Sequence, residues 1–195
     1  MRSREGGLQL FKCEGNIPVI EGERIKLRKM QANDVDVLLE YWGDPEVVKY
    51  MNMIPFTTSD EVLEMVTLLN GLAECEDNLR WGIELKEEHK LIGSCGFNTW
   101  QLSGAYRAEI GYELGKAYWR KGYMSEALRL MLSYGYEVMG LNRIEALVQP
   151  ANEASSKLLS SFHFQQEGLL RQYQKIEQGF VDLYLFSLLK EEYGL

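Results

Sequence analysis

Several kinds of feature are scarce or missing in this chain of 195 residues. The only histidines are His89 and His163, which are too few for a histidine-based zinc site. The cysteines Cys13, Cys75 and Cys95 are odd in number and lack metal-ligand or CxxC spacing, so we interpret them as free thiols of a reducing cytosol. No stretch is apolar enough to span a membrane, and the basic N-terminus lacks the apolar run of a signal peptide. We therefore expect a cytoplasmic protein without a metal.

An excess of basic residues is also missing. The formal net charge is −8 at pH 7, which argues against nonspecific nucleic-acid binding because that binding needs a basic face. The same charge suits a cationic substrate such as an amine or a basic peptide. It also serves solubility alone, so charge by itself identifies no partner.

The composition suits one globular domain with a sizeable core, because 46% of the residues are hydrophobic. Residues 1–22 have little periodicity and several glycines, and we expect a loose arm there. No linker, internal repeat or low-complexity segment divides the rest. We therefore expect a single domain over residues 23–195.

Strands cluster in the middle of the chain and alternate with helices afterwards. Ile25 and Leu27 are expected to point inward from a first strand because polar residues alternate with them. Asn33 and Ser59 are expected to cap helices. Further elements are expected as a helix at 45–50, a hairpin of strands 79–85 and 91–100, a strand 105–114, a helix 125–139, a strand 142–148, a helix 152–162, and strands 164–170 and 180–188. This order predicts an α+β fold with a mixed sheet and helices packed on it.

The most informative segment is the loop WRKGYM at residues 119–124, which follows a strand and opens a helix. Gly122 permits a positive φ and close backbone approach. The N–H groups around it lack helical partners, and the helix dipole adds positive potential, so they can bind one anion. Arg120 and Lys121 add full charges. A pyrophosphate fits this arrangement, whereas a capped helix with a glycine turn is the plain alternative.

This loop is neither a P-loop nor a dinucleotide-binding GxGxxG, so ATP and NAD are poor candidates. The chain from residue 23 onward instead resembles the GNAT superfamily of acyl-CoA-dependent N-acetyltransferases, and most of all the Rim-type branch that modifies ribosomal-protein N-termini. The resemblance is carried by EIGYEL at 109–114, WRKGYMSEA at 119–127, NEAS at 152–155, FHF at 162–164 and EG at 167–168. In the superfamily signature Q/R-x-x-G-x-G/A, the named positions hold Trp119, Gly122 and Met124, and only Gly122 matches strictly.

The resemblance implies a mostly antiparallel, splayed sheet flanked by helices on both faces, and acetyl-CoA as cosubstrate. The sheet is expected to open between the strands at Glu109 and Asn142, where the pantetheine arm would enter along a strand edge. Asn152 would meet the pantetheine from the other side, and it is also suited as a helix N-cap. The residues expected to bind acetyl-CoA are Tyr112, Glu113, Leu114, Trp119, Arg120, Lys121, Gly122, Tyr123, Met124, Ser125 and Asn152.

Acetyl transfer to an amine requires loss of an amine proton, polarisation of the thioester carbonyl and protonation of the leaving thiolate. Relatives carry a catalytic glutamate where this chain has Glu109, which would accept the proton through a water; the alternative is a solvent-facing strand residue. The resemblance to the Rim-type branch implies that Ser155 acts on the leaving sulfur, and we expect it to hydrogen-bond the developing thiolate; the alternative is an ordinary first-turn serine. Gln174 stands where some relatives place a second carboxylate, and it cannot act as a base. Tyr173 and Tyr123 carry hydroxyls and are further candidates for a part in the acetyl transfer.

The sequence does not identify the amine that accepts the acetyl group. The leading hypothesis is the N-terminal α-amine of a protein, such as a ribosomal protein. A small amine (a polyamine, amino sugar or antibiotic) is a second hypothesis, and a non-catalytic CoA-binding protein is a third. The family implies that Trp42, Tyr50, Met51, Met53 and Phe56 wall the acceptor site, with core packing as the alternative. We expect a monomer or homodimer without nucleic-acid or membrane partners.

Overall fold

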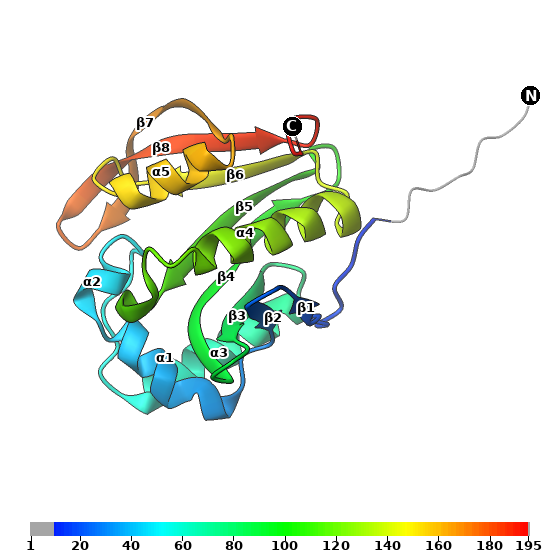
Figure 1. The fold of residues 1–195 in the computed structure, drawn as a ribbon. Helices are drawn as coiled ribbons and strands as arrows, with labels where there is room; N and C mark the ends of the chain where they lie inside the picture. The colour runs from blue at the N-terminus through cyan, green and yellow to red at the C-terminus, as the bar shows by residue number, and fades with distance from the viewer. Residues whose placement is uncertain (1–9, 195) are drawn as a thin grey trace, which may run out of the picture.

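The computed structural model describes residues 10–194, and they form one eight-stranded sheet with helices on both faces (Figure 1). The sheet order is β1-β2-β3-β4-β5-β6-β8-β7. All neighbouring strands are antiparallel except β5 and β6, which are parallel. The elements are β1 Ile20–Glu21, β2 Ile25–Arg28, α1 Val35–Trp42, α2 Pro45–Val48, α3 Ser59–Glu74, β3 Leu79–Leu85, β4 Lys90–Gln101, β5 Arg107–Leu114, α4 Tyr123–Ser133, β6 Arg143–Val148, α5 Glu153–Ser161, β7 Gln165–Ile176 and β8 Gly179–Leu189. The predicted α+β architecture is confirmed.

Each face of the sheet is covered by its own hydrophobic cluster. On one face the buried side of α4, with Leu128 and Met131, packs on the strands together with Leu159 of α5. On the other face α1 and α3 enclose a smaller cluster around Leu38 and Val62. None of the described helices is long and apolar enough to cross a membrane.

The segment before β2 packs on the domain. Cys13 and Ile17 are buried, and β1 pairs with β2. The Cys13 thiol donates to the Ala73 carbonyl at 2.7 Å, and the Glu76 carboxylate accepts from the Cys13 N–H at 3.0 Å. A loose arm is therefore wrong for residues 10–21, because partners at the end of α3 hold them; residues 1–9 lie outside the described part. The domain boundary at residue 23 stays a prediction.

Two helix starts differ from the predicted ones. Thr58, and not Ser59, is the N-cap of α3, because its hydroxyl accepts from the Glu61 N–H while Glu61 accepts from the Thr58 N–H. Asn33 lies inside a short 3-10 turn, and Asp34 occupies the N-cap position of α1. The predicted first strand is β2 in the structure. Its inward direction is confirmed, since Ile25 and Leu27 are fully buried.

The helix predicted over residues 125–139 divides into two parts. It begins at Tyr123, one residue after Gly122, and changes into a π-helix over Tyr134–Val138. Gly135 lies in this wide turn, where a Cβ would come within 2.9 Å of the Phe97 ring. The missing side chain thus lets the turn press against β4. Strand β7 runs to Ile176, beyond the predicted end at residue 170. Its pairing with β8 shifts register twice, between Gln166 and Gly168 and between Leu170 and Gln174.

Candidate active site

The parallel strands β5 and β6 pair at one end only. Pairing runs from Arg107 with Arg143 to Glu109 with Glu145 and then stops. A cavity of about 890 Å³ opens where the strands diverge, at the predicted position. All residues predicted to bind the donor or to act in catalysis line it except Lys121, namely Glu109, Tyr112, Glu113, Leu114, Trp119, Arg120, Gly122, Tyr123, Met124, Ser125, Asn152 and Ser155.

The loop before α4 has an unusual backbone. Arg120 has φ +59° and Gly122 has φ +80°, so two residues lie in the left-handed region within one short loop. Gly122 is the N-cap of α4, and the first N–H groups of a helix have no partner in a preceding turn. Residues 122–125 line the cavity, and N–H donors at a helix start are of the kind that can bind a phosphate.

Trp119 closes one side of this loop. Its indole N–H donates to the Leu114 carbonyl at 2.7 Å. The strand edge predicted to receive the pantetheine amides is therefore partly occupied, because one lone pair of Leu114 already has a donor. A tryptophan at this signature position thus links the loop to β5 and needs no side-chain contact with an anion.

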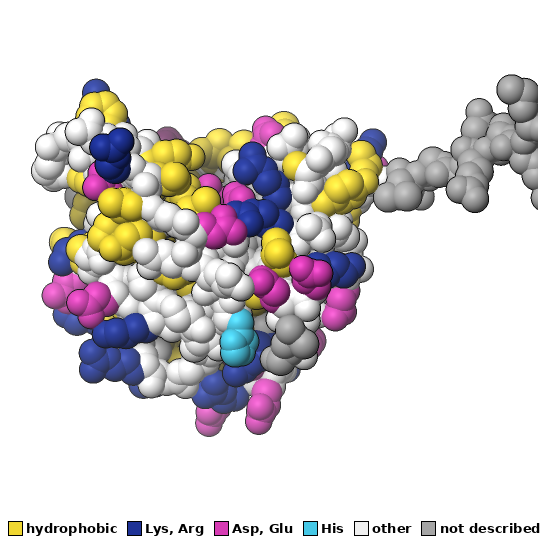
Figure 2. Space-filling view, turned by 90° about the horizontal axis from the view of Figure 1, so that it is seen from above, with side chains coloured by type: hydrophobic (Ala, Val, Ile, Leu, Met, Phe, Trp, Pro, Cys, Tyr) yellow, Lys and Arg dark blue, Asp and Glu magenta, His cyan; other side chains and the backbone are white. Residues whose placement is uncertain are grey.

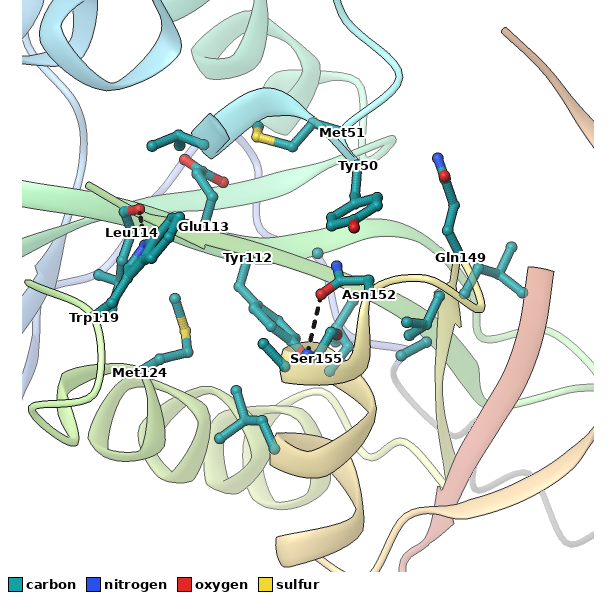
Figure 3. A pocket seen from close by; sticks show the side chains of 18 of the residues that line it. Tyr50, Met51, Tyr112, Glu113, Leu114, Trp119, Met124, Gln149, Asn152 and Ser155 are labelled. Carbon is teal, nitrogen blue, oxygen red and sulfur yellow. Dashed lines mark hydrogen bonds between the residues drawn. The ribbon is translucent and has the colours of Figure 1, made fainter. Parts of the chain in front are cut away.

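Asn152 and Ser155 open helix α5 on the other side of the cavity, as Figure 3 shows. The Asn152 side chain accepts from the Ser155 N–H at 3.2 Å, so the N-cap role is observed. The Ser155 hydroxyl lies 2.8 Å from the Tyr112 hydroxyl of β5. Burial raises the pKa of Tyr112 to about 12, although the hydrogen bond to Ser155 lowers it. The Tyr112 hydroxyl is therefore protonated at neutral pH.

Glu109 is held by a residue that the sequence did not suggest. The Asn98 amide donates to Glu109 Oε1 at 3.1 Å, and the Asn98 oxygen accepts from Arg80 at 3.4 Å. Asn98 sits where the β4–β5 register shifts, and Gly111 leaves room for it: a Cβ there would lie 2.8 Å from the Asn98 oxygen. The bulge and the glycine together aim this amide at Glu109.

Glu109 and Ser155 approach the gap from opposite faces of the sheet. Side chains alternate along a strand, so Glu109 shares a face with Glu113, which bonds to Trp42 of α1. Tyr112 points to the other face, toward α5. A molecule lying in the gap between β5 and β6 can thus meet a carboxylate on one side and a hydroxyl pair on the other.

Comparison with known families matches residues 24–165 to the acetyltransferase (GNAT) domain. The chain belongs to the GNAT acetyltransferase family. It is an acyltransferase.

Three relatives illustrate the breadth of the match. The uncharacterized N-acetyltransferase p20 of Bacillus licheniformis is 49% identical over 172 residues, 88% of this chain and 96% of that protein. The [ribosomal protein uS5]-alanine N-acetyltransferase of Escherichia coli is 29% identical over 108 residues, 55% of this chain and 56% of that protein. The Mycobacterium smegmatis RimJ structure, in complex with CoA-disulfide, matches the fold with TM-score 0.84 at 21% identity, covering 93% of this chain and 91% of that one.

Beneath the acetyltransferase cavity lies a buried ion pair. Glu113 accepts hydrogen bonds from Arg80, from Ser94 and, at 3.1 Å, from the Trp42 indole. A buried charge is tolerated only when it is paired and hydrogen-bonded. Glu113 lines the cavity, and three protein donors hold its carboxylate in place. Its predicted part in donor binding belongs to the strand edge and stays a prediction.

Arg24, which does not line the cavity, contacts the loop at residues 119–124 and the first turn of α4. Its guanidinium donates to the Lys121 carbonyl at 3.0 Å and to Glu126 at 3.0 Å, and it lies 4.8 Å from the centre of the Tyr123 ring. Although burial raises it, hydrogen bonds from Arg24 and Ile25 hold the pKa of Glu126 below its ordinary value. Arg24 and Glu126 are 102 residues apart, so no local pattern reveals this contact.

The wall predicted for the acceptor is only partly present. Tyr50 and Met51 line the cavity, and the Tyr50 hydroxyl donates to the Ala151 carbonyl at 3.1 Å, which connects α2 with the start of α5. Trp42 and Phe56 do not line it. They pack with Met53 in the cluster of α1 and α3, where Trp42 serves as a donor to a buried carboxylate.

The β7–β8 hairpin borders a second cavity of about 420 Å³, which shares Glu109, Leu147 and Tyr173 with the first. Tyr173 is 58% exposed, and Gln174 lines the first cavity beside it. Figure 2, which views the molecule from above Figure 1, shows hydrophobic and charged side chains interspersed on this end of the molecule. The shared residues place Glu109 where the two cavities meet.

Proposed function

We propose that this acetyltransferase uses acetyl-CoA to acetylate a primary amine. The observation that carries the proposal is the single cavity reaching from the Gly122 loop to Glu109 and Ser155. Its volume falls within the range of small-molecule and cofactor sites. The N–H groups of the loop suit a diphosphate, and the Leu114 edge with Asn152 suits the amides of a pantetheine arm.

Under this proposal the two faces of the gap have separate tasks. Glu109, held by Asn98, accepts the amine proton through a water molecule. Ser155 donates a hydrogen bond to the sulfur as its negative charge develops. Gln174 contributes no base. Much of the rate then comes from holding donor and acceptor together in the gap.

For the acceptor we propose the N-terminal α-amine of a protein. The E. coli relative is named for an alanine of ribosomal protein uS5, and the second cavity gives an acceptor its own approach to Glu109. We propose a cytoplasmic location, because the free thiols Cys13, Cys75 and Cys95 suit a reducing compartment. Residues 23–195 would form the catalytic domain, as a monomer or homodimer.

The test is acetylation of a panel by the purified chain with acetyl-CoA, read by mass spectrometry. The panel holds peptides with different N-terminal residues, a polyamine, an amino sugar and an aminoglycoside. We expect an acetyl group on peptide N-termini. Modification of the small amines alone would overturn the acceptor proposal. Saturable CoA binding by calorimetry without any product would favour a binding protein, and absence of CoA binding would overturn the donor as well.

A further inference from the structure

The hydroxyl pair of Tyr112 and Ser155 imposes a condition on the chemistry. Their oxygens are 2.8 Å apart, so one hydroxyl donates to the other. A serine hydroxyl carries a single proton. If Ser155 donates this proton to the Tyr112 oxygen, it cannot donate to a leaving sulfur. If Tyr112 is the donor, the Ser155 proton remains available for the sulfur.

Nearby serines of α5 behave differently. The Ser156 hydroxyl bonds to the Asn152 carbonyl at 3.3 Å, and the Ser161 hydroxyl bonds to the Leu158 carbonyl at 2.6 Å. The Ser155 hydroxyl instead lies in the cavity with Tyr112, while its own N–H is taken by the Asn152 side chain. Among Ser155, Ser156 and Ser161, it is the Ser155 hydroxyl that contacts another side chain in the cavity. Ser156, the next residue of the same helix, is therefore a matched control.

Two properties favour Tyr112 as the donor of the pair. A phenol is far more acidic than an aliphatic alcohol, so it is the stronger hydrogen-bond donor. Burial of the Tyr112 ring raises its pKa to about 12, so the proton stays in place at neutral and mildly alkaline pH. Hydrogen bonds in a chain also polarise one another, so donation from Tyr112 strengthens the next bond from Ser155.

We propose that Tyr112 is a positioning residue that donates to the Ser155 oxygen and leaves the Ser155 proton directed at the departing sulfur. This role rests on the proposed function. In the step, the amine nitrogen bonds to the acetyl carbon, the C–S electron pair passes to sulfur, and the amine proton passes to Glu109. Tyr112 and Ser155 keep their own protons and stabilise the thiolate by hydrogen bonds.

The test is a double-mutant cycle in the full chain with Tyr112→Phe, Ser155→Ala and the pair. Tyr112→Phe should lower kcat about 2- to 10-fold, the value of one hydrogen bond, and leave the Kd for acetyl-CoA unchanged. In the Ser155→Ala background, Tyr112→Phe should have no further effect, because its acceptor is absent. Ser156→Ala should keep the wild-type kcat. Unchanged kcat in folded Tyr112→Phe, or effects that multiply in the double variant, would overturn the proposal.

A second measurement covers the case in which Tyr112→Phe does not fold. Fluorotyrosine at position 112 keeps the ring and lowers the phenol pKa. Because the phenolate cannot donate, kcat of the fluorotyrosine chain should begin to fall at a lower pH than kcat of the wild type, and identical pH profiles would contradict the role. A wild-type chain that transfers no acetyl group would instead refute the proposed function itself, so the two failures are distinguishable.

Discussion

The two sides of the β5–β6 gap are built from different chemistry. On the α1–α3 side, two carboxylates and a guanidinium form a connected chain with one amide, from Glu109 through Asn98 and Arg80 to Glu113. On the α4–α5 side, the groups are backbone N–H donors and the neutral hydroxyls of Tyr112 and Ser155. Charges away from water need partners, whereas neutral donors can be supplied by a helix start and two side chains.

This difference predicts different consequences of mutation. On the charged side, a residue that contributes to chemistry is tied to groups that stabilise the fold, so the main effect of substitution should change from lost activity at Glu109 to lost stability at Glu113. On the neutral side, substitutions should lower kcat or CoA affinity and change stability little. The following predictions test this contrast, beginning with the largest effect.

The largest effect is expected at Glu109. Glu109→Gln keeps the shape of the side chain and removes the base, so turnover should fall by ~10²–10⁴ while CoA affinity is retained. Steady-state kinetics with calorimetry on the same preparation measures both. Asn98→Ala should cause a smaller loss, because the carboxylate remains but loses its 3.1 Å donor. Full turnover in Glu109→Gln would assign proton transfer to solvent or another group.

The next effect concerns stability. Glu113→Gln leaves the Arg80 guanidinium buried without its counter-charge, and breaking a buried pair typically costs about 3–5 kcal/mol. Urea unfolding should show this loss. Glu153→Gln is the control, since its pair with Lys157 is exposed on α5 and should change the free energy of unfolding far less. Equal midpoints for the two variants would remove the contrast between the sides.

On the neutral side, Gly122→Val should weaken CoA binding. A β-branched residue resists φ +80°, and the strain of about 1–2 kcal/mol corresponds to roughly a 5- to 30-fold higher Kd if the loop shifts to relieve it. Gly140→Val is matched, because Gly140 also has a positive φ with open space around it. That control should lose stability and keep its CoA affinity in calorimetry. Equal Kd values for both variants would separate Gly122 from the anion site.

Sequence patterns predicted the parts that depend on neighbours in the chain. The glycine loop, the Asn152 cap and the inward side of the first strand follow from local backbone rules, and each appears in the structure. Contacts between distant residues did not follow. Arg24 with Glu126 and Trp42 with Glu113 join segments 102 and 71 positions apart, so the sequence leaves open whether Trp42 forms an acceptor wall or packs in the core. Asn98 needed the β-bulge to be known before its direction had meaning.

The smallest predicted effect concerns the end of the β5–β6 gap where the two strands remain paired. Arg143 of β6 donates to Glu167 of β7 at 2.6 and 2.7 Å, and the Ser187 hydroxyl also donates to Glu167. The pKa of Glu167 is lowered to about 2, chiefly by Arg143 and then by Ser187. These contacts hold β6, β7 and β8 together where the sheet stays paired.

A lowered pKa makes this contribution pH-dependent. The unfolded carboxylate titrates near its usual pKa of about 4.3, so the stabilisation is complete above that pH and is lost as the pH falls toward 2. Glu167→Gln should therefore lower Tm by a few degrees at neutral pH, and the gap from wild type should narrow below about pH 4. Because Glu167 is partly exposed, solvent screening keeps the effect small. Scanning calorimetry from pH 7 to 3 measures it, and a constant difference in Tm across that range would show that Glu167 acts through packing and not through its charge.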